Sequence, residues 1–243
     1  MLEIRNLTKT YKGGKRAVDN LSLQVEAGDI CGFIGHNGAG KTTAIKCIVG
    51  IHDFDQGEIK VDGVSVRANP MYCKSVLAYV PDNPDLYEYL TGIQYLNFMA
   101  DIFGIPEDVR QKRIEKEASD LGLLAALGDL ISSYSHGMKQ KLALIGALIH
   151  KPKLLILDEP FVGLDPAASL MLKQKMHELC ANGSAVFFST HVLDVAEKLC
   201  NKVVIIKNGR LVAAGDVGEL TGGASLESVF MEVACDAEAD SIS

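Results

Sequence analysis

The chain has 243 residues, and its 24 lysines and arginines stand against 31 aspartates and glutamates, which gives a net charge of −7. A hydrophobic share of 48% is typical of a globular protein, and the length suits one large domain or one domain that carries an inserted unit. The acidity argues against a duplex nucleic-acid binder, which would carry a basic face. Arg210 is the last basic residue, and all of the excess acids follow it.

The predicted elements at the start of the chain alternate between strands and a helix. Residues 4–7 and 21–25 carry apolar side chains at every second position, as half-buried strands do. Residues 30–34 form a short apolar run that ends at Gly35, and a helix is expected over 42–49. Further strands are expected at 58–61 and 76–80.

A helical pattern then covers residues 84–150. Thr91 is expected to cap a helix that runs to Phe103, Pro106 to start a charged helix, and Ser135 to open a third helix with a buried apolar run. Strand patterns return at 154–157, 185–189, 203–206 and 211–213. Between the first two of these lies a helix with Asp165 as its cap and Pro166 at its first position.

The C-terminal residues predict one more helix. Leu226, Val229, Phe230 and Val233 share a helical face, so we expect this helix to pack back on the core, with a solvated or disordered end from residue 234. The resulting prediction is an α/β fold with a core over 1–83 and 151–220, a helical subdomain over 84–150, and an acidic helix and tail over 221–243.

Targeting and redox signals are few. The six cysteines are scattered, with no CxxC pair and no metal-ligand spacing, which is typical of reduced thiols in a cytosolic protein. The N-terminal residues lack the apolar region of a signal peptide. The longest apolar run, residues 142–149, is far too short for a membrane span. We therefore expect a chain that does not cross a bilayer by itself.

The strongest motif is the segment GHNGAGKT at residues 35–42. It matches GxxxxGK[ST] and lies between a predicted strand and a predicted helix, which argues against a chance match in a glycine-rich turn. In such a loop the backbone N–H groups and the helix N-terminus hold phosphate oxygens. Lys41 is expected to reach the β- and γ-phosphates, and Thr42 to place its hydroxyl on Mg²⁺.

A second motif follows a buried strand. Four apolar residues at 154–157 lead into Asp158 and Glu159, so both carboxylates emerge at the carboxyl end of the strand, where ligands bind in doubly wound sheets. Asp158 is expected to bind Mg²⁺. Glu159 is expected to polarise water for attack on the γ-phosphate.

The order of these motifs resembles that of the nucleotide-binding subunits of ABC transporters, over about residues 1–220. The phosphate loop resembles Walker A, and residues 154–159 resemble Walker B. The segment YSHGMKQ at 134–140 is similar to the LSGGQ-type signature, Gly163-Leu164-Asp165 to the D-loop, and Ser189-Thr190-His191 to the switch-histidine segment.

The resemblance implies a P-loop NTPase core with a mixed, largely parallel sheet, an antiparallel β subdomain and the helical insert. It also implies roles at single positions. Lys41, Glu159 and His191 would be catalytic, and Thr42, Asp158 and Asp82 would hold Mg²⁺. ATP would be bound, with Tyr11 stacked on adenine, by Tyr11, Asn37, Gly38, Gly40, Lys41, Thr42 and Thr43, and by Ser135 and Gly137 of the signature.

Two positions depart from the family pattern. Asp82 stands where the family usually has glutamine, so a shorter and charged side chain would reach Mg²⁺ there. His136 replaces a glycine of the signature, which puts a bulky ring into the approach to the γ-phosphate, while Ser135 and Gly137 are retained.

The family resemblance further implies a head-to-tail homodimer or heterodimer that ATP closes and hydrolysis reopens. It would drive a separate membrane permease from the cytoplasmic, inner face of the cell membrane. Leu86, Tyr87 and Tyr89 form a candidate docking site for a permease helix, with local aromatic packing as the alternative. Similarity in residues 189–215 and in the signature favours exporters.

Other functions remain as alternatives. A soluble ABC-type ATPase of DNA repair or chromosome organisation usually carries long coiled-coil insertions, and this sequence has none. Relatives among translation factors carry two cassettes in one chain. A nucleotide-dependent interaction module without hydrolysis is disfavoured by the Asp158-Glu159 pair. The transported substrate is unreadable, because it would bind the permease.

Overall fold

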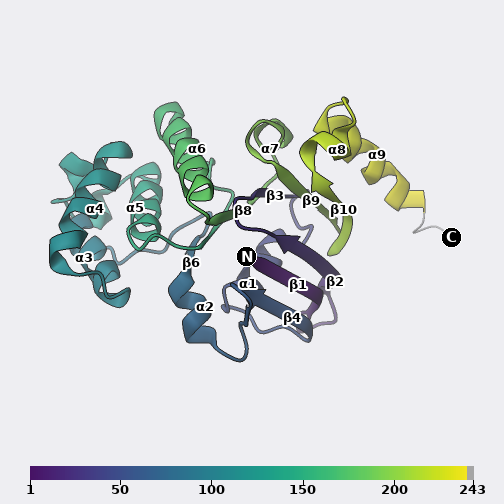
Figure 1. Cartoon of the computed structure of the whole chain (residues 1–243), viewed down its shortest axis with the longest axis horizontal. Coiled ribbons are helices and arrows are strands. Elements are labelled where there is room, and N and C mark those ends of the chain that lie inside the picture. The colour runs from purple at the N-terminus through teal and green to yellow at the C-terminus, as the bar shows by residue number, and fades with distance from the viewer. Residues whose placement is uncertain (240–243) are drawn as a thin grey trace.

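The computed structural model describes residues 1–239, with side chains through residue 232. It contains two β-sheets with helices packed between and around them (Figure 1). The antiparallel sheet has the order β2-β1-β4-β5, and the larger sheet has the order β10-β9-β3-β8-β7-β6. The strands of the first are β1 (Leu2–Thr10), β2 (Arg16–Val25), β4 (Gln56–Val61) and β5 (Val64–Ser65). Those of the second are β3 (Ile30–Ile34), β6 (Leu77–Val80), β7 (Leu154–Asp158), β8 (Ala185–Thr190), β9 (Lys202–Lys207) and β10 (Arg210–Asp216).

The larger sheet is parallel except at one edge. Strands β6, β7, β8, β3 and β9 run in parallel, and β10 pairs antiparallel with β9. Strands β3, β7 and β8 are buried along their whole length, and they are mostly apolar, as expected for a sheet that is covered on both faces. In β7, Leu155 and Leu157 belong to one hydrophobic core, and Leu154 and Ile156 belong to the other.

Helices cover the two faces differently. Helix α1 (Lys41–Ile48) packs in the same core as the antiparallel sheet, and α6 (Pro166–Ala181) and α7 (Leu193–Leu199) cover the opposite face. Figure 1 shows α6 and α7 above the larger sheet and α1 below it, next to the antiparallel sheet. The carboxyl ends of β3, β7 and β8 therefore open into the space at the start of α1.

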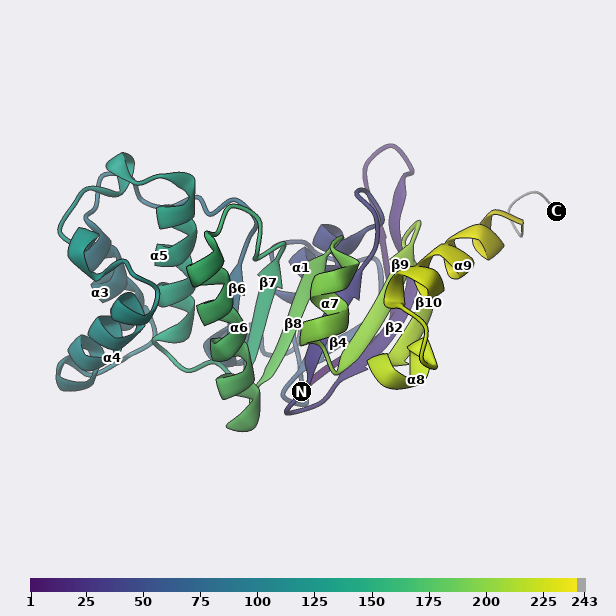
Figure 2. The same cartoon turned by 90° about the horizontal axis from the view of Figure 1, so that it is seen from above.

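The helical segment forms its own group beside β6. It consists of α3 (Gly92–Ile102), α4 (Glu107–Asp120), two short 3₁₀ turns (Leu124–Ala126 and Ile131–Ser133) and α5 (His136–Leu148). Figure 2 shows this group at one end of the molecule, with α6 between it and the rest of the larger sheet. Thr91 caps α3 in a capping box with Gln94, as the sequence predicts for Thr91.

A buried lysine ties this segment to α6. Lys175 of α6 is 4% exposed, and its ammonium group pairs with Asp120 and, at 3.0 Å, with Glu117 of α4. These charges are satisfied only while α4 and α6 keep their relative position.

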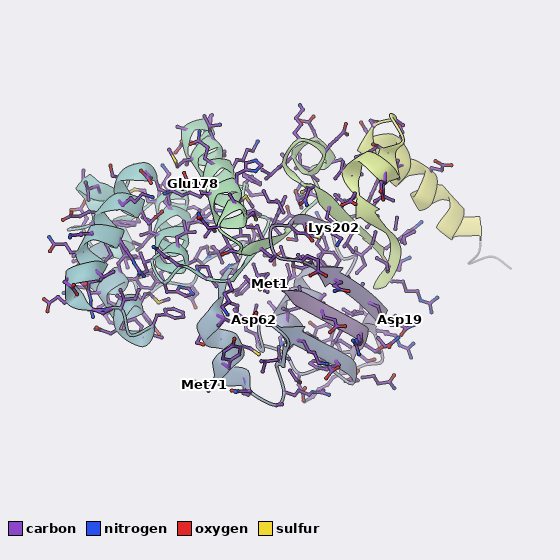
Figure 3. The ribbon with its side chains drawn as sticks, in the orientation of Figure 1. Met1, Asp19, Asp62, Met71, Glu178 and Lys202 are labelled. Atoms are coloured by element: carbon purple, nitrogen blue, oxygen red, sulfur yellow. The ribbon has the colours of Figure 1, made fainter. Side chains whose placement is uncertain are left out.

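Two ion pairs join the antiparallel sheet to the larger one. Asp19 of β2 accepts a hydrogen bond from Arg210 of β10 at 2.7 Å, and Asp62 accepts one from Lys153, just ahead of β7, at 2.6 Å. Figure 3 labels Asp19 and Asp62 on either side of the antiparallel sheet. The hydrogen bond from Arg210 lowers the pKa of Asp19, and the bond from Lys153 lowers the pKa of Asp62.

The C-terminal helices α8 (Val217–Thr221) and α9 (Leu226–Ala239) lie beside α7 and β10. Leu226 is fully buried, and Val229 and Phe230 pack on the core, so the predicted packing of this face is confirmed for these three residues. Helix α9 continues to Ala239, so residues 234–239 are helical, where a solvated or disordered end was predicted from residue 234. The side chain of Val233 and the predicted tail end at 240–243 lie outside the described residues.

The predicted fold class is confirmed, and several elements differ in detail. Helix α2 (Pro70–Val76) precedes β6, so Val76 ends a helix and was wrongly predicted to begin the strand.

The five cysteines with described side chains are buried and free, as expected. Among the residues that the structure describes, every helix is too short or too polar to pass through a bilayer.

Candidate functional site

The phosphate loop lies between β3 and α1, as the sequence predicts. Gly40 caps α1 with a φ of +108°, a conformation that favours glycine. A β-carbon at this position would also collide with the carbonyl oxygen of Ala17. Glycine at residue 40 therefore lets the loop turn into the helix directly against β2.

The loop forms one wall of a cavity of about 340 Å³. Every predicted nucleotide or metal ligand outside the signature lines it: Tyr11, Asn37, Gly38, Gly40, Lys41, Thr42, Thr43, Asp82 and Asp158. Glu159, predicted to be catalytic, lines it as well. Lys15, Ala17 and His36, which were not singled out from the sequence, complete the lining. The lining residues thus come from segments that extend along the chain from the end of β1 to the residue after β7.

Lys41 points into the loop that precedes it. Its side chain is 6% exposed, and its ammonium group donates to the carbonyl oxygen of Gly35 at 2.5 Å. The carbonyl oxygen of His36 lies 3.4 Å from the same nitrogen, and a Glu159 carboxylate oxygen lies at 3.6 Å. A buried cation at this place gives the cavity the positive centre that a phosphate group requires.

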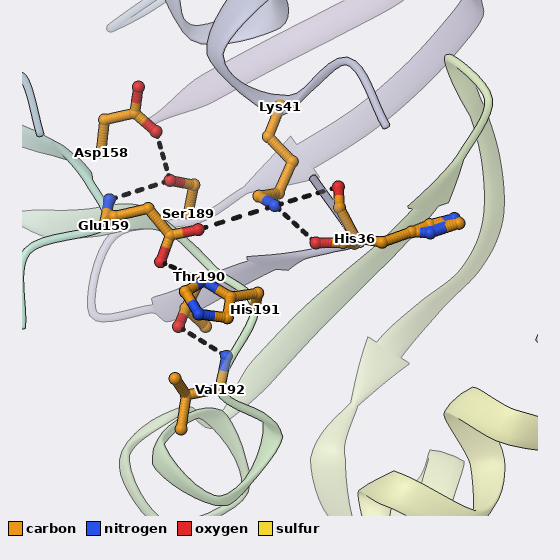
Figure 4. Close-up of polar contacts among 9 residues, drawn as sticks. His36, Lys41, Asp158, Glu159, Ser189, Thr190, His191 and Val192 are labelled. Carbon is orange, nitrogen blue, oxygen red and sulfur yellow. Dashed lines mark hydrogen bonds and ion pairs between the residues drawn. The ribbon is translucent and has the colours of Figure 1, made fainter. Parts of the chain in front are cut away.

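Glu159 links Lys41 to His191. One carboxylate oxygen faces Lys41, and the other lies 3.0 Å from Nδ1 of His191 (Figure 4). The backbone of Glu159 is left-handed, with a φ of +48°, which costs about 1 kcal/mol for a residue with a β-carbon. This turn directly follows the end of β7 and brings the carboxylate between the lysine and the histidine.

Ser189 and Thr190 hold this end of the site in place. The hydroxyl of Ser189, fully buried, donates to Asp158 at 2.5 Å and accepts from the backbone N–H of Glu159 at 3.0 Å. The hydroxyl of Thr190 accepts from the N–H of Val192 at 3.0 Å, which turns the chain at His191. Figure 4 shows these contacts as one connected group.

The donor set suits a magnesium ion. Thr42, Asp82 and Asp158 all line the cavity, and they offer hydroxyl and carboxylate oxygens, the hard ligands that Mg²⁺ prefers. Asp158 is only 4% exposed, and Ser189 engages one of its oxygens, so its carboxylate is held in a fixed orientation.

Tyr11 lies at the outer side of the cavity. Its ring is 39% exposed, and its hydroxyl lies 3.2 Å from the hydroxyl of Thr43. Because it stands at the cavity wall on a strand end, it is not a buried core tyrosine. A planar base could contact the exposed part of this ring.

The signature residues do not line this cavity. Ser135 caps α5 and accepts a hydrogen bond from the N–H of Met138 at 3.3 Å. The ring of His136 lies against Gly163, where a β-carbon would be 2.8 Å from its Cδ2. Gln140 is 1% exposed and donates to the carbonyl oxygen of Pro160 at 3.1 Å. The start of α5 is therefore packed on the segment that follows Glu159.

A chain with a phosphate loop, a buried loop lysine and paired carboxylates at the end of a parallel strand is a P-loop nucleotide-binding protein. The family described as "ABC transporter" matches residues 18–162 of this chain. The chain therefore belongs to the ABC transporter family, as an ATP-binding subunit that hydrolyses ATP in a process coupled to transport.

Individual relatives agree with this family. The chain is 34% identical to the ABC-type transporter ATP-binding protein EcsA of Bacillus subtilis, over 96% of each chain. It is also 34% identical to the linearmycin resistance ATP-binding protein LnrL of Bacillus subtilis, over 90% of this chain and 70% of that protein. A solved structure of an ATP-binding subunit of an ABC transporter superposes with a TM-score of 0.92 at 34% identity and covers 96% of this chain and 99% of that one.

Proposed function

We propose that this chain hydrolyses ATP at the Lys41–Glu159–His191 site to drive export by a separate membrane permease. The position of Glu159 supports hydrolysis most directly. Its two carboxylate oxygens face Lys41 and His191, and the residue lines the phosphate-loop cavity. The similarity of this chain to the linearmycin resistance ATP-binding protein LnrL supports export as the direction of transport.

The proposed roles follow from this geometry. Lys41 exchanges its carbonyl contacts for β- and γ-phosphate oxygens when ATP enters. Glu159 accepts a proton from the attacking water, and His191 orients Glu159 and donates to the γ-phosphate. Thr42, Asp158 and Asp82 hold Mg²⁺, which when bound neutralises phosphate charge.

The remaining part of the site comes from a second subunit. Ser135 and Gly137 lie at the start of α5 and outside the cavity, so one chain supplies only one side of the phosphates. We infer a head-to-tail dimer, of two copies or of two related chains, in which each signature covers the partner's ATP. The ring of His136 is directed at Gly163 of its own chain, which leaves the helix N-terminus with Ser135 for the γ-phosphate.

A groove beside the site is the proposed permease contact. A cavity of about 380 Å³ lies between β6 and the helical segment, and Leu86, Tyr95, Met99 and Phe103 are among its lining residues. It also includes Pro81, next to Asp82 of the nucleotide cavity. Tyr87 and Tyr89 follow Leu86 of this lining without lining the groove themselves; they are 47% and 75% exposed, and Tyr87 packs on Phe98. An amphipathic cytoplasmic helix of the permease would bury its apolar face here.

This docking proposal places the chain on the cytoplasmic face of the cell membrane, and it is tested by co-purification. A membrane permease that is co-expressed with this chain and binds it should co-purify with the wild-type protein and should be lost with the Tyr87→Ala/Tyr89→Ala variant. ATP binding of the variant should be unchanged, because neither tyrosine lines the nucleotide cavity.

The control is Leu124→Ala, which removes an exposed apolar side chain of the helical segment outside the groove. It should retain the permease. Retention of the permease by the double tyrosine variant would refute the docking site. Unchanged ATP hydrolysis on adding the permease would favour the alternative, an ABC-type ATPase that is not coupled to transport.

A further inference from the structure

Helix α9 is anchored on the helix that follows the switch histidine. The backbone N–H of Leu226 donates to a Glu197 carboxylate oxygen of α7 at 2.9 Å, and the Leu226 side chain is fully buried. Val229 packs on the same core as Ala196 of α7. Helix α7 starts at Leu193, two residues after His191. The first turns of α9 therefore have a fixed position relative to the nucleotide site.

The next residues of α9 reach the phosphate loop itself. The ring of Phe230 meets the ring of His36 edge to face, with centroids 6.3 Å apart and an interplanar angle of 81°. This geometry is favourable for an aromatic pair. His36 is the second residue of the phosphate loop and lines the nucleotide cavity. Figure 4 shows its ring directed away from Lys41, while its carbonyl oxygen faces the lysine.

The contact falls on the exposed part of the loop. Residues 36–38 are exposed, and a β-carbon on Gly38 would meet no other atom within 4 Å. The two ends of the loop are held firmly, because Gly35 is buried and Gly40 lies against the backbone of β2. In the outer arc, the carbonyl oxygen of His36 accepts from the N–H of Ala39 at 3.1 Å, and the His36 ring adds its contact with Phe230. A loop that is ordered before ATP arrives loses less conformational entropy on binding.

We propose that Phe230 is a positioning residue for ATP binding, which acts from the C-terminal helix through His36. This inference rests on the proposed function only in that the phosphate loop binds ATP. It gives α9, which lies outside the matched residues 18–162, a defined part in the nucleotide site. The helix contacts both the phosphate loop and α7, so it bridges the loop and the helix that follows His191.

The test compares steady-state ATP hydrolysis and ATP binding of full-length variants. Phe230→Ala should raise both the KM and the Kd for ATP about threefold to tenfold, the range expected from losing one edge-to-face aromatic contact. The kcat should change less than about twofold, because Lys41, Glu159 and His191 are untouched. Phe230→Tyr keeps the ring and should restore wild-type KM.

Two further variants separate positioning from simple destabilisation. Met231→Ala changes the neighbouring side chain of α9, which is 58% exposed, and should leave KM unchanged. His36→Ala should raise KM as Phe230→Ala does, and the double variant should be no worse than either single one, because the two residues act through one contact.

A lower melting temperature of Phe230→Ala with wild-type KM would overturn the proposal, and so would effects that multiply in the double variant. Failure here is distinguishable from failure of the proposed function. If Lys41→Ala still bound ATP with wild-type affinity, the phosphate-loop assignment itself would be wrong.

Discussion

At the scale of single residues, Ser189 connects the Asp158 carboxylate to the backbone of Glu159. Its hydroxyl contacts the Asp158 side chain and the Glu159 backbone, and it is fully buried. Ser189→Ala would leave the nearly buried Asp158 without this donor, so the free energy of unfolding should fall by about 1–3 kcal/mol. Because both carboxylates would shift, kcat for ATP should fall at least about tenfold.

The matched control is Ser184→Ala, which lies just before β8 and loses a hydrogen bond to the carbonyl oxygen of Pro152. Chemical denaturation and phosphate-release kinetics measure the two effects. The control should lose some stability and keep its kcat. Equal kcat values for Ser189→Ala and the wild type would show that this hydroxyl does not position the site.

Sequence patterns identified the ionisable residues of the site, but they did not identify the role of their hydrogen-bond partner Ser189. Lys41, Asp158, Glu159 and His191 occur in motifs whose spacing is local, and the structure brings them together or adjacent. Ser189 was quoted only as the start of a motif, because its role depends on pairing between β7 and β8. The register that sets Asp158 opposite Ser189 is a tertiary feature.

At the scale of elements, local signals decided what could be predicted. Strand β3 was predicted with its observed bounds, because a short apolar run ends at a glycine. Strands β1 and β2 are longer than predicted, since register shifts interrupt the apolar alternation and left-handed backbone occurs at Asn6 and Asn20. Helix α2 was missed although Asn69 and Pro70 form a start signal, because the apolar run after it suggested a strand.

His150 joins three elements and makes their packing sensitive to pH. It follows α5, its Nε2 donates to the carbonyl oxygen of Leu77 in β6 at 3.3 Å, and its ring stacks on Phe103 at the end of α3. Burial lowers the pKa of His150 from 6.5 to about 4. Between these values the unfolded chain binds a proton that the folded chain does not, so stability falls as the pH drops from 6.5 towards 4.

This loss should reach up to about 3 kcal/mol, as the size of the pKa shift implies. Urea unfolding at pH 7 and pH 4.5 measures it. His150→Gln keeps a donor for Leu77 but does not titrate, so its stability should decrease less over this range than that of the wild type. Identical pH dependence of the two proteins would mean that His150 is not the responsible group.

At the scale of the whole molecule, the two hydrophobic cores explain why the fold class was readable. The apolar runs at 30–34, 154–157 and 185–189 are too continuous for one-sided strands, and in the structure both faces of the larger sheet are covered. The placement of α9 beside the phosphate loop was not readable, because nothing in its amphipathic pattern specifies which surface receives it. Its acidic residues account for part of the net charge of −7.

The whole-molecule proposal is an ATP-closed dimer that Glu159 reopens by hydrolysis. It is tested most directly with Glu159→Gln, which keeps the shape of the side chain and removes its charge. Phosphate release should fall at least about 100-fold, because the proton acceptor is lost. The Kd for ATP should stay within about threefold of wild type, because Lys41 and the phosphate loop remain.

Light scattering of the same variant should show a doubling of mass when ATP is added, with Glu58→Gln on β4 as the control that hydrolyses ATP normally. Loss of phosphate release together with retained ATP binding and a stable ATP-bound dimer is the predicted result. Phosphate release at the wild-type rate, or a monomer at saturating ATP, would contradict it.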